Sequence, residues 1–307
     1  LESDRIRDDY NAERLDNGVK VSTTFLDYGR EEKGSGMIYS GIYNSISGVN
    51  NLNEFNMAEK ITKDLNPSYG SIQALKTRDT DVVVLAEDKV LKVTTNKDAL
   101  FNADGSAQLL ASNRVLGTAV PFSGDYGISN NPESLAWDQY RLYFTDMQRG
   151  AVLRLSGNGI TPISNVGMKS YFRKELPNTK SLLGSFDIVN GEYNLSMWNF
   201  NPKSSKTVSF NEGTKGWVSF KSFIPAEGIS VGGKYFTANA EFSNNRGAPE
   251  IWQHHYDEID DDTNSPTYGQ VNNRNTFYGI HGDSTVDVLF NDMPSSVKTF
   301  RTLNYEG

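Results

Sequence analysis

The stretch from Tyr140 to Ser164, YRLYFTDMQRGAVLRLSGNGITPIS, is the most regular part of the chain and limits what it can fold into. Apolar and polar residues alternate in LYFTD and in AVLRLS, which is the period of a strand with one buried face. The segments DMQRG and GNG supply glycines suited to tight turns. We expect a three-stranded meander with Gly150 in a turn and Phe144, Val152 and Leu155 in the core. Neighbouring sheets must complete it, because one such meander cannot bury its own apolar face.

Similar groups of short β-branched runs recur along the chain. They begin near residues 71, 134, 181 and 229, at spacings of 63, 47 and 48 residues. Propeller blades repeat at about 40–50 residues. The sequence therefore predicts an all-β fold of antiparallel meanders that is β-propeller-like. A β-sandwich is the alternative, since it uses the same short strands. The apolar runs at 284–292 and 297–305 predict two final strands.

One segment interrupts this alternation. Val166, Tyr171, Phe172 and Leu176 follow a helical spacing, and Pro177 comes next. We therefore expect one short helix at 166–176.

The two ends of the chain differ in character. Residues 1–70 are charged at first and then rich in Gly, Asn and Ser, so we expect an irregular N-terminal segment that packs on a partner. Residues 71–307 are expected to form the β domain. The chain opens on LESDRIRDDY without Met and stops on an apolar, strand-like run. We therefore expect it to be part of a longer or processed chain.

Composition excludes several classes of protein. The formal net charge is −8, which opposes non-specific binding of nucleic acid over the whole surface. There is no Cys, so no disulfide, thiolate nucleophile or Cys-ligated metal can form, as is usual for proteins made in a reducing cytoplasm. No apolar run approaches the roughly 18 residues that a membrane helix needs. We expect no membrane segment and no recognition of nucleic-acid sequence.

The segment HHYDEIDDD brings imidazoles and carboxylates close together in sequence, and both groups bind divalent cations. Neighbouring residues on a strand point to opposite faces, so His254 and His255 would not face one ion. The acidic run from Asp257 to Asp262 lacks the Gly and Glu spacing of an EF-hand loop. We expect a solvated acidic loop, with a weak cation site near 254–262 as the alternative.

No catalytic constellation is marked by the sequence. A glycosidase needs two carboxylates a few ångströms apart, but Asp146, Asp187 and Glu212 lie in or beside turns, where we expect them to accept backbone N–H bonds. No G-x-S-x-G elbow or phosphate loop is present, and His281 has no evident partner. We expect no catalytic, cofactor-binding or metal-binding residues, and no cofactor.

Two kinds of local feature remain. SFNEGTKGW faintly resembles the turn motif of sialidase propellers and predicts only a hairpin at Asn211–Gly216. Aromatic side chains could stack on sugars, but each tryptophan lies in or beside a strand-like run, so core packing is expected for Trp137, Trp198, Trp217 and Trp252.

Several blocks together resemble a known family. They are ASNRVLGTAVPFSGDYGIS, GISNNPESLAWDQYRLYFTDMQRGAVLRLSGNGITPISNVGMKSYF, KTVSFNEGTKGWVSFKSFIPAEGIS, EIWQHHYD and STVDVLFNDMPSSVKTFRTLNYEG. In this order they are similar to segments of large virion structural proteins of tailed bacteriophages, among them crAss-like and marine phages. The resemblance spans roughly residues 71–307. It implies a tail component at the hub, at the nozzle or near the portal, with propeller-like domains and ring assembly.

The sequence thus leads to a hypothesis and an alternative. The hypothesis is a non-enzymatic structural protein of a phage tail, assembled in the host cytoplasm. Its partners would be copies of itself and other tail or portal proteins. The alternative is a receptor-binding or glycan-cleaving tail protein, which would need a pocket lined by Trp, Arg and two close carboxylates.

Overall fold

A computed structural model describes residues 32–55, 61–78, 81–101, 107–199, 204–239 and 250–257, and parts of 259–302. Contacts within the chain divide it into two compact units, Leu1–Tyr256 and Asp257–Gly307.

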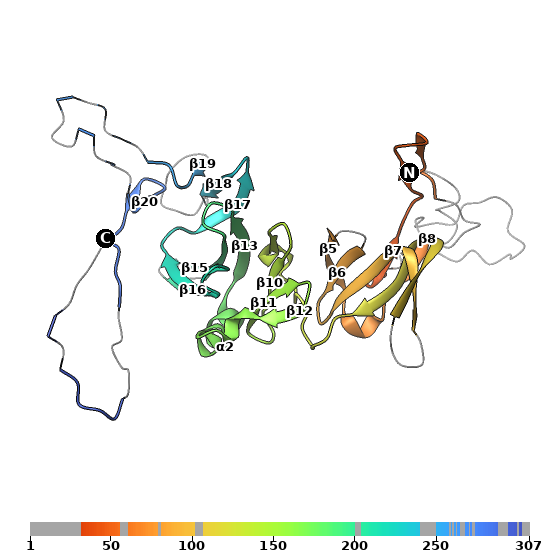
Figure 1. The fold of residues 1–307 in the computed structure, drawn as a ribbon, viewed down its shortest axis with the longest axis horizontal. Coiled ribbons are helices and arrows are strands. Elements are labelled where there is room, and N and C mark those ends of the chain that lie inside the picture. Colours follow the sequence, from red (N-terminus) through yellow and green to blue (C-terminus); the bar gives the residue numbers. More distant parts are fainter. Residues whose placement is uncertain are drawn as a thin grey trace, which may run out of the picture. The chain divides into compact units, whose positions relative to one another are not determined.

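The described residues of the first unit form four larger antiparallel sheets, each built from strands consecutive in the chain (Figure 1). The first sheet comprises β5 (Ile72–Arg78), β6 (Asp81–Ala86), β7 (Val90–Phe101) and β8 (Ala107–Pro121). The second comprises β9 (Ala136–Trp137), β10 (Leu142–Asp146), β11 (Ala151–Ser156) and β12 (Gly159–Pro162). The third comprises β13 (Ser181–Asp187), β14 (Glu192–Trp198), β15 (Lys206–Asn211) and β16 (Gly216–Lys221). The fourth comprises β17 (Pro225–Val231), β18 (Lys234–Asn239) and β19 (Ile251–Gln253).

The four sheets confirm the predicted fold class and the predicted series of meanders. A run of three Val residues forms β6, as its β-branched composition indicates, whereas β13 and β14 are built on Leu and aromatic residues. The long strand β8 was not expected, because its sequence, AQLLASNRVLGTAVP, lacks a sustained alternation. No closed barrel or propeller is present in the described part of the chain, so the propeller-like arrangement is not confirmed.

The second sheet is buried on both faces, which corrects the prediction of one buried face. Phe144 and Leu153 pack with Val83 and Leu85 of the first sheet. The neighbouring side chain of Tyr143 points the other way, into a cluster with residues of the third sheet, and is also fully buried. Polar positions of an alternating strand can be buried when a partner element covers them and satisfies their polar atoms. The predicted core residues Phe144, Val152 and Leu155 are each 0% exposed, which confirms them.

The predicted helix is confirmed, with shorter bounds. Helix α2 spans Lys169–Glu175 and is flanked by 3-10 turns η4 (Ile163–Asn165) and η5 (Leu176–Asn178). Phe172 and Leu176 are fully buried and anchor this segment in the cluster between the second and third sheets. Gly150, in the turn after β10, has φ +62°, and a Cβ there would lie 2.7 Å from the Arg173 Cα of α2. The predicted turn position of Gly150 is therefore confirmed, and this turn leaves little room for a side chain.

The N-terminal part covers the outer face of the first sheet. Strands β1 (Gly36–Ile38) and β4 (Thr62–Asp64) pair with each other, and η2 (Pro67–Tyr69) follows them. Met37 and Tyr69 pack on a buried cluster formed by Leu65, Val84, Ala86, Leu91 and Val93. A short hairpin, β2 (Tyr43–Asn44) and β3 (Val49–Asn50), lies between β1 and β4 in sequence.

The second unit contains little regular structure in its described residues. Strands β20 (Thr276–Phe277) and β21 (Ile280–His281) form a hairpin, and Ile259 makes an isolated bridge to Val271. Strands were expected at 284–292 and 297–305, but residues 284–287, 297–299 and 301–302 are not in strands, and the rest lie outside the described residues. A β-prone run forms a strand only when another strand pairs with it, and Val297 is fully exposed. Within the described residues, no helix has the length and apolar character needed to span a membrane.

Candidate functional site

Four hairpin turns of the first unit share one construction. Each has four residues between paired positions, Asn44 and Val49, Asp146 and Ala151, Asp187 and Glu192, or Asn211 and Gly216. In each turn, the side chain of the Asn or Asp that precedes the four residues accepts a hydrogen bond from a backbone N–H group two or three residues later. The fourth turn residue has a positive φ of 51–72° in all four turns. The hairpin predicted at Asn211–Gly216 is therefore confirmed, and the spacing of Asp or Asn from the residue with positive φ is a sequence signal for this turn.

A buried carboxylate links the first and second sheets. Asp146 is 0% exposed and accepts hydrogen bonds from the backbone N–H of Gly127 (3.2 Å) and the hydroxyl of Ser129 (3.1 Å), both in the connection between these sheets. Arg149 donates to Asp146 at 2.9 Å and also contacts Asp88, in the hairpin between β6 and β7, at 3.2 Å. Asp146 thus accepts backbone bonds in its turn, as predicted, and also ties the two sheets together.

A second carboxylate links the second and third sheets. Glu212, in the β15–β16 turn, accepts a hydrogen bond from the Tyr143 hydroxyl at 2.7 Å. It also forms an ion pair with Arg154 at 2.9 Å. The Tyr143 ring stacks on Phe186 and Tyr193 of the third sheet, with centroids 5.7 and 5.0 Å apart. Burial, and then the bond to Glu212, raise the pKa of Tyr143 far above its usual value. Glu212 binds side chains of another sheet, and not the backbone of its own turn as its sequence position suggested.

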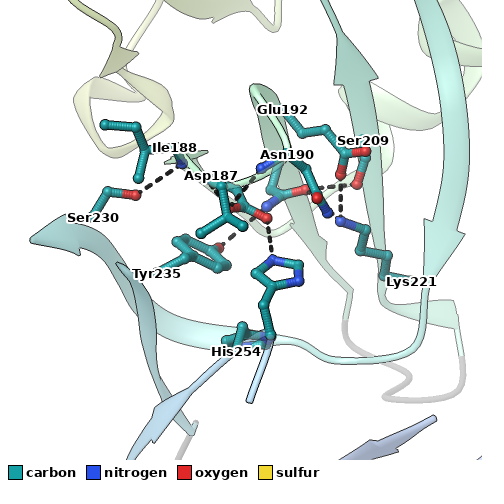
Figure 2. Close-up of polar contacts among 12 residues, drawn as sticks. Asp187, Ile188, Asn190, Glu192, Ser209, Lys221, Ser230, Tyr235 and His254 are labelled. Atoms are coloured by element: carbon teal, nitrogen blue, oxygen red, sulfur yellow. Dashed lines mark hydrogen bonds and ion pairs between the residues drawn. The ribbon is translucent and has the colours of Figure 1, made fainter. Parts of the chain in front are cut away.

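A layer of polar side chains lies between the third and fourth sheets (Figure 2). On the third sheet, most of the buried residues of β13, β14 and β15 on this face are polar, namely Ser185, Asp187, Glu192, Asn194, Ser196, Thr207 and Ser209, and the buried Leu183 is an apolar exception. From the fourth sheet, the Tyr235 hydroxyl lies 2.7 Å from Ser185 Oγ and accepts from the Asn194 side-chain amide at 3.3 Å. The Asn194 carbonyl accepts from Ser209 at 2.6 Å. Burial raises the pKa of Tyr235 to about 12, so its hydroxyl stays protonated near neutral pH.

The edges of this polar layer are closed by charged groups (Figure 2). Lys221 of β16 contacts Glu192 at 2.6 Å. Asp187, whose side chain is 1% exposed, accepts from the Val189 N–H at 3.0 Å and lies 2.7 Å from Nε2 of His255. Ser230 of β17 donates to the Phe186 carbonyl at 2.6 Å. A buried polar network with all its groups bonded can fix one relative placement of two sheets, because any shift leaves several groups unpaired.

The two neighbouring histidines lie beyond the end of β19, so the premise that they occupy a strand was wrong. His255 has φ +57° and binds Asp187, whereas His254 Nε2 lies 2.7 Å from the Thr237 hydroxyl. They therefore still reach separate partners. Asp257 and Asp261 are exposed, and Glu258, Asp260 and Asp262 lie outside the described residues. Across the described part of the chain, no three His, Asp or Glu side chains come together to hold a metal ion.

Lowering the pH is expected to destabilise the fold through His254. Burial, and then the nearby His255, lower the pKa of His254 to about 4, against about 6.5 in an unfolded chain. Between these pH values the unfolded chain binds a proton at His254 that the folded chain does not bind. The contribution of neutral His254 to the free energy of unfolding is therefore complete above pH 6.5 and falls as the pH drops to 4. We expect a loss of roughly 1–3 kcal/mol between pH 7 and 4, because His254 is only partly buried.

Urea unfolding of the wild type and His254→Gln at several pH values measures this effect. The variant should be less stable at pH 7, and its free energy of unfolding should change less between pH 6.5 and 4 than that of the wild type. His281→Gln is the matched control, because His281 is exposed. Equal pH dependence in the wild type and His254→Gln would contradict the assignment.

The tryptophans fall into two groups. Trp198, Trp217 and Trp252 are partly buried. The indole N–H of Trp217 donates to the Ile163 carbonyl at 3.1 Å, and that of Trp198 donates to the Pro225 carbonyl at 3.3 Å. Trp137 is 50% exposed, and the Lys76 ammonium lies 3.5 Å from its ring centroid. Core packing is therefore confirmed for Trp217, which packs against a buried cluster, and is wrong for Trp137, because β9 is a two-residue edge strand.

The arrangement favours a mechanical role for these polar groups. Asp146, Glu212 and Asp187 each join successive sheets and are occupied by donors from neighbouring elements. They line neither of two cavities of about 420 and 530 Å³ in the first unit. The sequence marked these three carboxylates but could not show that their partners come from other sheets, since Tyr143 and Glu212 are 69 residues apart.

A comparison with protein families decides the identity of the chain. The sequence model of the Crassvirus muzzle protein family matches residues 49–241, which are 193 of the 307 residues. The chain belongs to the Crassvirus muzzle protein family. It is therefore a structural protein of a crAss-like phage virion, as the resemblance in its sequence implied. No curated protein matches the chain.

The region matched to the muzzle family coincides with the stacked sheets. It begins at β3, includes the first three sheets and ends after β18. All three junction carboxylates lie within it, whereas His254 and His255 lie beyond it. The muzzle family match and the series of linked sheets thus concern the same part of the molecule.

Proposed function

We propose that this muzzle-family chain is a component of the phage tail that acts by assembling with copies of itself and with other tail or portal proteins. The observation that carries the proposal is the family match over residues 49–241. The fold agrees with a structural role, because its successive sheets are joined by buried aromatic stacks and charged hydrogen bonds. Assembly of the particle would take place in the host cytoplasm.

We also propose that the four sheets are blades of a propeller-like arrangement. Three features support this: each of the first three sheets has four antiparallel strands, the strands of every sheet are consecutive in the chain, and neighbouring sheets share buried clusters. The outward face of the fourth sheet carries exposed Ile229, Val231 and Ile251. A blade in the middle of a series buries both faces, as the second sheet does.

Labelling of intact particles tests the placement in the tail. Antibodies raised against the purified chain, coupled to gold, should mark the tail of virions that encode this protein. Labelling confined to the capsid, or no labelling of particles whose proteins include the chain, would overturn the tail assignment. Mass photometry of the purified chain tests assembly separately and should reveal oligomers at micromolar concentration.

We expect the purified chain to have no hydrolase activity, because the three marked carboxylates bind neighbouring sheets and line neither described cavity. The measurement is release of reducing ends from peptidoglycan and from bacterial surface polysaccharides. Cleavage that is abolished by Asp146→Asn, Asp187→Asn or Glu212→Gln, in a variant that remains folded, would contradict this expectation. It would favour the alternative of a glycan-cleaving tail protein.

A further inference from the structure

A cationic cavity lies beside helix α2. It has a volume of about 530 Å³ and is lined by the connection at Gly124–Tyr126, the β10–β11 turn and α2. Its charged side chains are Asp125, Arg149, Lys169 and Arg173. The close approach of Gly150 to the backbone of α2 fixes the turn and the helix against each other, so the cavity has a rigid wall.

Two of the cavity's cations lack a counter-charge in the described structure. Arg149 is paired with Asp146 and Asp88, and Asp125 is paired with Lys89 at 2.9 Å. Lys169 and Arg173 are exposed and make no ion pair with any described carboxylate. The cavity therefore presents two free cations on a chain whose net charge is −8.

The placement of Lys169 on helix α2 is electrostatically unfavourable, whereas Arg173 lies in the last turn, where the backbone dipole favours a cation. They are four residues apart in α2 and so lie on one face, where like charges repel each other. Lys169 is the first residue of the helix, where the backbone dipole disfavours a cation, and the first turn has no acidic residue. An anionic group bound from outside would relieve both effects.

The chain itself carries a suitable anion. Five of the six residues from Asp257 to Asp262 are acidic, and the run begins two residues after His255, which is held to Asp187. The run thus begins next to a residue held at the junction of the third and fourth sheets, whereas the cavity is lined by the connection from the first sheet to the second, by the β10–β11 turn and by the segment with α2 that follows the second sheet. Nucleic acid fits the cavity less well, since binding its phosphate backbone takes many cations and a favourable overall charge.

We propose that the acidic run 257–262 of one copy docks in the cationic cavity of a second copy, with its carboxylates on Lys169 and Arg173. The two surfaces differ and lie at different junctions, so the contact is heterologous and joins copies head to tail. The inference rests on the proposed assembly function and names one contact that serves it.

Charge reversal tests the contact on the full chain by sedimentation velocity at several concentrations and salt levels. Lys169→Glu with Arg173→Glu should weaken self-association by roughly tenfold or more, and so should D257K/D260K/D261K. Lys174→Glu is the matched control: Lys174 lies on the same helix, its side chain is 81% exposed and it does not line the cavity. It should leave the association constant within about twofold, as expected of an exposed charge outside the contact.

Mixing the two reversed variants supplies the decisive outcome. An intermolecular contact should be restored in the mixture. The acidic cavity of the first variant then meets the basic run of the second, and the acidic run of the first meets the unchanged basic cavity of the second. Failure of the mixture to associate when each variant alone has lost association would overturn the proposal, as would a cavity variant that associates like the wild type. Oligomers that are insensitive to every reversal would leave the assembly function standing without this contact, whereas a wild-type chain that stays monomeric would overturn both.

Discussion

Truncating Phe144 to Ala is expected to lower the free energy of unfolding by about 3–5 kcal/mol, the usual range for a buried aromatic. The side chain is 0% exposed and packs with Leu85 and Leu153, between the first and second sheets. The cavity cannot close easily, because the opposite face of β10 is held by Tyr143 against the third sheet. A domain is stable by only about 5–15 kcal/mol, so the variant should lose a large share of its stability.

Gln148→Ala is the control for this experiment. Gln148 lies in the turn that follows the same strand and is exposed, so its truncation should change stability by less than about 0.5 kcal/mol. Denaturant melts of both variants give the comparison. If Phe144→Ala is as mild as Gln148→Ala, the burial of β10 between two sheets is wrong.

Adding a single methyl group at Gly184 is expected to cost about 3 kcal/mol, the upper end of the range for an overpacked core. A Cβ at this position in β13 would lie 2.0 Å from the carbonyl oxygen of Ser134 and 3.1 Å from Cε2 of Tyr193. The Ser134 carbonyl also accepts the hydroxyl of Tyr193 at 2.9 Å, so moving it would break a buried hydrogen bond. In a strand with free space around it, replacing Gly by Ala would raise the free energy of unfolding. A decrease at Gly184 would therefore show that β13 closely approaches the backbone of Ser134.

Gly157→Ala is the matched substitution without a clash. Its added Cβ would meet only the Arg78 guanidinium, at 3.8 Å, so a change within about 0.5 kcal/mol is expected. Thermal or denaturant unfolding of both glycine variants measures the difference. A Gly184→Ala protein as stable as the wild type would show that β13 does not press on the 3-10 turn η3 (Pro132–Ser134).

The sequence by itself determined the strands and most of the turns. Alternation over five or six residues and the glycines of the turns between them depend on local geometry, so they placed β10 and β11 at their observed bounds. Local chemistry also predicted the short helix that is observed as α2 and the core position of Phe144. It failed at 284–287, because a strand needs a partner that a local pattern does not specify.

Only the tertiary structure decided which faces are buried and what the carboxylates bind. Tyr143 occupies a position that alternation assigns to solvent, yet it is buried because Glu212, 69 residues away, accepts its hydroxyl. Asp187 meets His255 across 68 residues in the same way. These pairs form only when whole sheets stack, so their energy depends on long-range packing, which short-range periodicity does not encode.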